Sequence, residues 1–121
     1  VYHYSSYETR HVGQLVGSGG TPHLDWVLPW VHEHFVDLYA SVKNNFFGCH
    51  GLGLKVVAQL GADFHWRDAE PDGLKSLQWY EEAVGAETAA ERAAAQRRLL
   101  EYNEDDVRAT HHLRAWLDAS A

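Results

Sequence analysis

The sequence predicts one small α/β domain that is mostly helical and has one or two strands. The first observation is the segment 1–4, VYHY, whose aromatic and β-branched residues are typical of a strand. The second is the series of amphipathic or Ala-rich segments in the rest of the 121 residues. The third is that no repeat and no linker-like segment divides the chain. Because one strand cannot make a sheet, either further strands of a larger sheet lie upstream of Val1 or the domain is all-α.

The first half of the chain predicts short helices. Ser5 and Glu8 have the spacing of a capping box, and the helix that they begin is expected to end at the glycines from Gly17 onward. Pro29 is expected to break or bend whatever helix forms around it. The segment 54–60 predicts a further short helix, which Gly61 stops.

The second half predicts longer helices. The Ala-rich segment 87–102 strongly favours a helix, with Thr88 and Glu91 as its capping box. Asn103 then looks like the cap of a last helix, with Val107 and Leu113 on its apolar side. An amphipathic helix is also expected within 72–85. Its apolar candidates are Leu74, Leu77, Trp79 and Tyr80.

Composition and charge limit the classes of function. The formal net charge of −7 argues against a protein that holds nucleic acid on a broad basic surface. It leaves open an enzyme that acts on nucleic acid through bound cations. Cys49 is the only cysteine, so an intrachain disulfide is excluded, and with no visible signal peptide we expect a cytoplasmic protein. No apolar run approaches the roughly 20 residues that span a bilayer, so no membrane partner is expected.

The segment 99–110, LLEYNEDDVRAT, gathers four acidic residues within six positions. Asn103 with an acidic first turn behind it is one explanation, because the helix dipole favours anions there. Two details weigh against an entirely solvated role. Tyr102 and Asp106 lie four residues apart and therefore on one side of a helix. Asp106 also borders the expected apolar stripe, where a carboxylate needs a cation.

Five segments of the chain resemble a known family. In order they are YHYSSYE, DLYASVK, GLKVVAQLGADFHWRD, SLQWYEEAVG and LLEYNEDDVRATHHLRAWL. Together they are similar to the C-terminal RNase H-like (DnaQ-like) domain of the RecB-like putative nuclease family. Within them, YNEDD fits Tyr-x-x-x-Asp, which looks like the third motif of the tyrosine branch of the DEDD 3′–5′ exonuclease superfamily. The resemblance implies an RNase H-like fold for residues 1–121 and a nuclease that hydrolyses phosphodiester bonds.

The resemblance also implies site residues. Asp106 would bind metal, and Tyr102 would position the attacking water or help to deprotonate it. HYSSYE stands where the second motif usually lies, so Glu8 would take the role of its acid. Asp37 lies where these domains often carry an Asp and is a further metal-ligand candidate. Without the resemblance, Glu8 completes a capping box, Asp37 caps the following turn, and Tyr102 packs in the core.

The implied cofactor is a pair of Mg²⁺ or Mn²⁺ ions, and the implied substrate is DNA or RNA. Hard cations of this kind prefer several oxygen ligands. The Asp-x-Glu strand that normally supplies the first motif would lie upstream of Val1. We therefore expect a partial domain, inactive or nearly so alone, whose partners include other domains of a parent chain. The alternative is a non-catalytic scaffold or interaction module with merely solvated acids.

Other residue types favour ordinary structural roles. The nine histidines lack the spacing of a zinc site, and scattered surface or half-buried positions explain them better. The arginines of the C-terminal helices are expected on a solvated face paired with acids. The five tryptophans are expected mainly in the core.

Overall fold

A computed structural model of the chain describes residues 1–18, 22–46 and 48–121. Its longest connection between described elements is the segment 61–72, between the fourth and fifth α-helices. The elements are β1 (Tyr2–His3), α1 (Tyr7–Ser18), the 3-10 helix η1 (Pro22–Leu24), α2 (Val27–His34), β2 (Val36–Asp37), α3 (Leu38–Asn45), α4 (Leu54–Leu60), α5 (Gly73–Gly85) and α6 (Ala89–Ser120).

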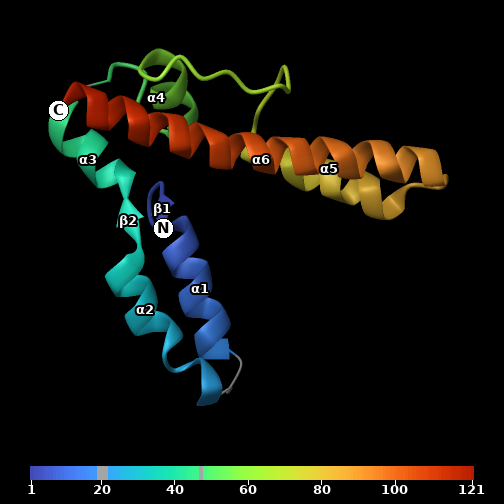
Figure 1. The fold of residues 1–121 in the computed structure, drawn as a ribbon. Helices are drawn as coiled ribbons and strands as arrows, with labels where there is room; N and C mark the ends of the chain where they lie inside the picture. Colours follow the sequence, from blue (N-terminus) through green and yellow to red (C-terminus); the bar gives the residue numbers. More distant parts are fainter. Residues whose placement is uncertain (19–21, 47) are drawn as a thin grey trace.

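The helices form two arms that meet along α6 (Figure 1). In one arm, α5 lies against the N-terminal half of α6; in the other, α1 lies beside α2. The C-terminal half of α6 runs past the end of the α1–α2 arm, where it contacts α4 and β1. α6 therefore contacts α5 with its N-terminal half and the first strand of the chain with its C-terminal half.

The two strands form a small parallel sheet. Tyr2 lies opposite Val36, and His3 lies opposite Asp37. The sequence prediction of one or two strands is confirmed for the described residues, and an all-α domain is not. The pairing matters for the site because it fixes the start of α1 beside the start of α3.

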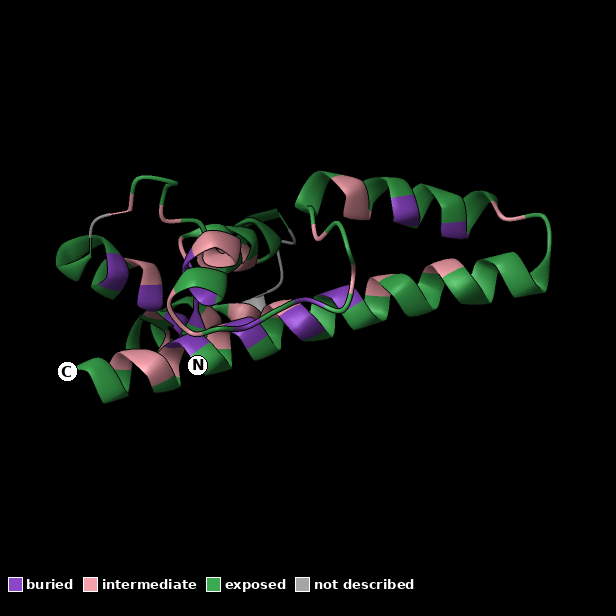
Figure 2. Ribbon diagram, turned by 90° about the horizontal axis from the view of Figure 1, so that it is seen from above, coloured by how far each residue is buried: buried purple, intermediate pink, exposed green. Residues whose placement is uncertain are grey.

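The core consists of two apolar clusters, both of which include buried residues of α6. Buried α6 positions recur at intervals of three and four, which places them on one helical face. Figure 2 shows this buried face in the middle and C-terminal half of α6, whereas most of α5 and the N-terminal half of α6 are exposed. One cluster comprises Ala58, Phe64, Trp66, Trp79, Tyr102 and Ala109, and the other comprises Tyr4, Leu38, Val42, Val57 and Leu113.

The predicted helix boundary at Asn103 is wrong. α6 runs without interruption for 32 residues from Ala89, and its N-terminus is closed by the predicted Thr88–Glu91 capping box. A helix needs only one N-terminal cap, and Asn103 lies in its interior with an exposed side chain. The acidic residues after Asn103 therefore do not lie in a first turn.

Two local predictions in the first half are also wrong. Pro29 lies inside α2, but at the third helical position, where a missing N–H removes no intrahelical hydrogen bond. Ser5 does not form a capping box with Glu8, because its backbone N–H donates to Asp37 Oδ1 at 2.7 Å. The predicted end of this helix in the segment that starts at Gly17 is confirmed, because α1 ends at Ser18. The short helix over 54–60, ended at Gly61, is confirmed.

The predicted buried face of α5 is only partly correct. Trp79 is buried, but Leu74, Leu77 and Tyr80 are 79%, 62% and 61% exposed. Ala83, four residues after Trp79, is the second buried position. α5 therefore packs on α6 along a narrow stripe and turns most of its apolar residues outward.

Among the described residues, every helix is too short or too polar to span a bilayer.

Candidate nuclease site

Glu8 and Asp106 line the same cavity, which has a volume of about 720 Å³. Glu8 belongs to the first turn of α1, and Asp106 lies in the middle of α6. The cavity is also lined by Tyr7 and His11 of α1 and by Arg114 of α6. Two acids almost a hundred residues apart are therefore brought to one hollow, as a shared site requires.

Asp106 is held by two neighbours from outside α6. Trp66 Nε1 donates a hydrogen bond to Asp106 Oδ1 at 2.8 Å. The Lys55 ammonium lies 3.5 Å from the same oxygen, and both side chains of this ion pair are 33% exposed. The carboxylate is thus held through Oδ1 by a core N–H and by a cation, and it lines the cavity.

The Tyr102 hydroxyl belongs to the same group of side chains. Lys55 Nζ donates to Tyr102 Oη at 2.8 Å, so one ammonium joins the tyrosine to Asp106. The Tyr102 ring packs edge-on against Trp79 with its centroid 5.5 Å away. Burial raises the pKa of Tyr102, and the Lys55 hydrogen bond partly opposes that rise. Tyr102 is therefore both a core residue and a neighbour of the candidate acid.

Glu8 lies beside the strand end rather than at the Asp106 carboxylate. Its Oε2 is 3.6 Å from Nδ1 of His3, a buried side chain of β1. The same His3 nitrogen lies 2.7 Å from the Ser5 carbonyl oxygen, which fits donation of an Nδ1–H to that carbonyl. Glu8 is about half exposed, and it lines the cavity that Asp106 also lines.

Asp37 is engaged in backbone contacts and lines a different cavity. Its Oδ1 accepts from the Tyr39 N–H at 2.9 Å, which caps α3, and from the Ser5 N–H at 2.7 Å. The other cavity, of about 480 Å³, includes His3 and residues of α1 and α2. These contacts fit the capping alternative, and the metal role of Asp37 stays a prediction.

The remaining acids of the cluster have a partner that the sequence analysis missed. The Arg67 backbone N–H and Nε donate to Asp105 at 2.8 and 2.9 Å, and its Nη2 donates to Glu104 at 2.8 Å. The same Nη2 donates to the carbonyl of Glu101. Burial of Asp105 works against ionisation, but the hydrogen bonds and charge of Arg67 outweigh it and lower the pKa of this carboxyl. Two of the four carboxylates of the cluster, those of Glu104 and Asp105, therefore bind one arginine.

Lys55 and Trp66 were also missed as neighbours of the site. Both occur in the GLKVVAQLGADFHWRD segment, which the sequence analysis used only for the resemblance. Lys55 lies in the first turn of α4, where the helix dipole disfavours a cation. This unfavourable position is the one local signal that the Lys55 ammonium has a partner outside its own helix. That partner lies 47 residues away and is not visible from spacing.

The carboxylates that line the cavity are suitable ligands for a hard divalent cation, but they are too few to complete its coordination. Glu8 and Asp106 offer carboxylate oxygens, the ligands that Mg²⁺ and Mn²⁺ prefer. Within residues 1–18, 22–46 and 48–121, no three His, Cys, Asp or Glu side chains gather as a metal site. The Asp-x-Glu sequence that the chain does contain, Asp68 to Glu70, lies between α4 and α5 and is bonded to Arg98 and Lys75.

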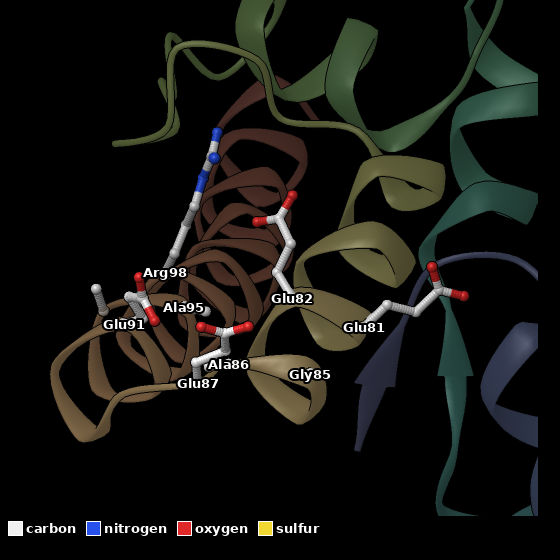
Figure 3. A pocket seen from close by; sticks show the side chains of 9 residues that line it. Glu81, Glu82, Gly85, Ala86, Glu87, Glu91, Ala95 and Arg98 are labelled. Carbon is white, nitrogen blue, oxygen red and sulfur yellow. The ribbon is translucent and has the colours of Figure 1, made fainter.

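A second hollow between α5 and α6 is rich in glutamate but is no better as a metal site. It has a volume of about 730 Å³, and Arg98 is its one cation. Figure 3 shows that the Glu81 side chain points away from those of Glu87 and Glu91. Among the described residues no three of its carboxylates gather as a metal site, and the sequence motif points to the Glu8–Asp106 cavity, which remains the candidate site.

Comparison with known proteins identifies the class to which this fold and site belong. The chain is a member of the RNase H superfamily. The family model RNase_H_2, described as RNase_H superfamily, matches residues 1–118. No curated protein and no solved structure matches the chain. Membership indicates a nuclease-like function related to nucleic acid.

Proposed function

We propose that the chain is part of a metal-dependent nuclease domain of the DEDD type that hydrolyses phosphodiester bonds at DNA or RNA ends, as 3′–5′ exonucleases do. The observation that supports this most is the shared cavity of Glu8 and Asp106, with Tyr102 joined to Asp106 through Lys55. The family match over residues 1–118 supports the same class. The finer assignment to the tyrosine branch and the RecB-like family rests on the sequence resemblance.

In this proposal Glu8 and Asp106 each supply carboxylate oxygens to a divalent cation, Mg²⁺ or Mn²⁺. Such a cation, when bound, activates a water molecule and stabilises negative charge on phosphate oxygens. Tyr102 lies beside Asp106 to orient a water through its hydroxyl. Trp66 keeps the Asp106 carboxylate at the edge of the cavity by its hydrogen bond.

Two carboxylates are fewer than a two-metal centre uses. We therefore propose that residues 1–121 alone are inactive or nearly so, and that further oxygen ligands come from other parts of a parent protein. Asp37 is a weaker candidate, since its Oδ1 already accepts two backbone hydrogen bonds.

A specific observation also favours the second candidate, a non-catalytic module. Asp106 already has a cation and an N–H donor, so it is satisfied without metal. In that case the Glu8–Asp106 cavity is a structural hollow, and the RNase H-like domain acts as a scaffold or interaction unit.

Mn²⁺ titration distinguishes the two candidates. We would record calorimetry and NMR line broadening on this chain and on a longer natural chain that includes it, with Asp106→Asn and Glu8→Gln. Glu101→Gln is a matched control, because this exposed acid does not line the cavity. The nuclease proposal predicts saturable binding that both cavity variants weaken and the control does not. Cleavage of end-labelled DNA and RNA by the longer chain then tests activity. Absence of Asp106-dependent binding in both chains would favour the scaffold.

A further inference from the structure

Lys55 contacts two candidate site residues, Tyr102 and Asp106, with its side chain. It is the second residue of α4, and its side chain reaches across to the middle of α6. Its Nζ lies 2.8 Å from Tyr102 Oη and 3.5 Å from Asp106 Oδ1. It also lies over two aromatic rings, 4.9 Å from the centroid of Tyr102 and 5.4 Å from that of Trp66.

These contacts place a unit positive charge directly at the acid proposed to bind metal. At a few ångströms, a like charge opposes the binding of a divalent cation, and it does so more strongly where the local dielectric constant is low. Metal and ammonium therefore compete for Asp106 unless the ammonium moves. A lysine suits such movement, because its charge sits on a flexible stem and Lys55 is one third exposed.

The geometry at Asp106 leaves room for an exchange. The hydrogen bond from Trp66 and the ion pair with Lys55 both involve Oδ1, and neither engages Oδ2 of this cavity-lining residue. The Trp66 hydrogen bond keeps the carboxylate in place when the ammonium leaves. The same departure releases the Tyr102 hydroxyl, since Lys55 donates to it.

We propose that Lys55 is an internal cation that occupies Asp106 in the absence of metal, and that a divalent ion binds there by displacing it and so frees the Tyr102 hydroxyl. The inference rests on the proposed nuclease function. It makes Lys55 a positioning residue that couples metal binding to the state of Tyr102. It differs from a purely structural ion pair, in which loss of the lysine charge would leave metal affinity unchanged or weaker.

The test compares Mn²⁺ affinity in wild type, Lys55→Met and Asp106→Asn. Methionine keeps the length and apolar stem of lysine without its charge. We expect Lys55→Met to bind Mn²⁺ about tenfold more tightly than wild type, and Asp106→Asn to abolish the gain. Lys75→Met is the matched control, because Lys75 lies on α5, pairs with Glu70 in the preceding connection and does not line the cavity. Lys55→Gln provides a second neutral variant, and far-ultraviolet circular dichroism checks that each variant folds.

A second readout follows the Tyr102 side chain itself. With ¹³C-labelled tyrosine, Mg²⁺ should shift the wild-type Tyr102 resonance, and metal-free Lys55→Met should already lie near the metal-bound position. Tyr102→Phe assigns the resonance. A merely structural lysine would not give this coincidence.

The outcomes separate the inference from the proposed function. If wild type binds metal through Asp106 and the neutral Lys55 variants bind no tighter, the displacement is overturned while the nuclease site stands. If neither wild type nor the Lys55 variants show Asp106-dependent binding, the metal site itself is overturned and the displacement with it. Tighter binding in the Lys55 variants supports both.

Discussion

Arg67 binds Asp105 through both its backbone N–H and its guanidinium, at 2.8 and 2.9 Å. This pair fastens the segment between α4 and α5 to the middle of α6. Asp105 is only 2% exposed, so its carboxylate depends on Arg67 for compensation. The next residue, Asp106, lines the cavity instead. Asp105 therefore stabilises the fold, whereas its neighbour Asp106 is a candidate site residue.

The first prediction concerns this pair. Asp105→Ala should lower the free energy of unfolding by about 2 kcal/mol, because it removes charge-assisted hydrogen bonds at a buried position. Urea unfolding measures the change. Glu104→Ala is the control, since it removes only an exposed partner of Arg67 and should cost well under 1 kcal/mol. Equal costs for the two variants would contradict the stabilising role of Asp105.

Stability should depend on pH through the same carboxyl. Arg67 holds the pKa of Asp105 below its ordinary value of 3.8, against the effect of burial. The contribution to stability is therefore present above 3.8 and is lost as the pH falls through the lower pKa of the folded state. The difference in unfolding free energy between wild type and Asp105→Asn should be largest near neutral pH and shrink at about pH 3. A difference that grows on acidification would show the opposite sign of linkage.

Tyr102 should respond to the loss of Lys55. Burial raises the pKa of Tyr102, and the Lys55 hydrogen bond acts in the other direction. Lys55→Met should therefore raise the pKa of Tyr102 further. An alkaline NMR titration of ¹³C-labelled tyrosine would follow it, and Lys75→Met should leave that resonance unchanged. An unaltered titration of Tyr102 in Lys55→Met would mean that the contact has no energetic weight.

The hydrogen bond from Trp66 to Asp106 should appear in a double-mutant cycle. Trp66→Phe keeps an aromatic ring but removes the Nε1–H donor, and Asp106→Ala removes the acceptor. We expect a coupling free energy of about 1 kcal/mol between the two changes, measured by urea unfolding. Strictly additive effects would argue that the core does not fix the Asp106 carboxylate.

Asn103 gives a prediction whose sign distinguishes two helix arrangements. In the interior of α6, Asn103→Ala should stabilise the protein by about 0.5 kcal/mol, because alanine favours helix more than asparagine does. An N-cap asparagine would instead lose about 1 kcal/mol on the same change. Thr88→Ala provides the contrast, since it removes the capping box that is present and should cost about 1 kcal/mol. Thermal unfolding of the two variants measures both changes in stability relative to wild type.

Features governed by contacts within a few residues were predictable. The Thr88–Glu91 capping box and the helix 54–60 ended by Gly61 follow from local hydrogen bonding and backbone preference. The placement of Tyr102 and Asp106 on one side of a helix follows from the helical repeat alone. The sequence also carried the family resemblance, and the RNase H superfamily match over residues 1–118 supports its coarser part.

Features that depend on distant partners were not predictable from the sequence. Asn103 and Pro29 carry strong local signals, but continuous helix around each of them is compatible with their exposure and position. Leu74 and Leu77 form a suitable apolar face, yet α5 turns Trp79 and Ala83 toward α6 instead.

The sequence by itself determined that the described chain begins with a short strand and is mostly helical, and that Tyr102 and Asp106 share one side of a helix. Only the tertiary structure decided that Glu8 lines the same cavity as Asp106, that Arg67 binds the carboxylates of Glu104 and Asp105, and that Lys55 pairs with Asp106. The physical reason is that helix caps and periodicity act within one or two turns. The compensation of a buried or half-buried charge comes from whichever cation the folded chain brings within a few ångströms.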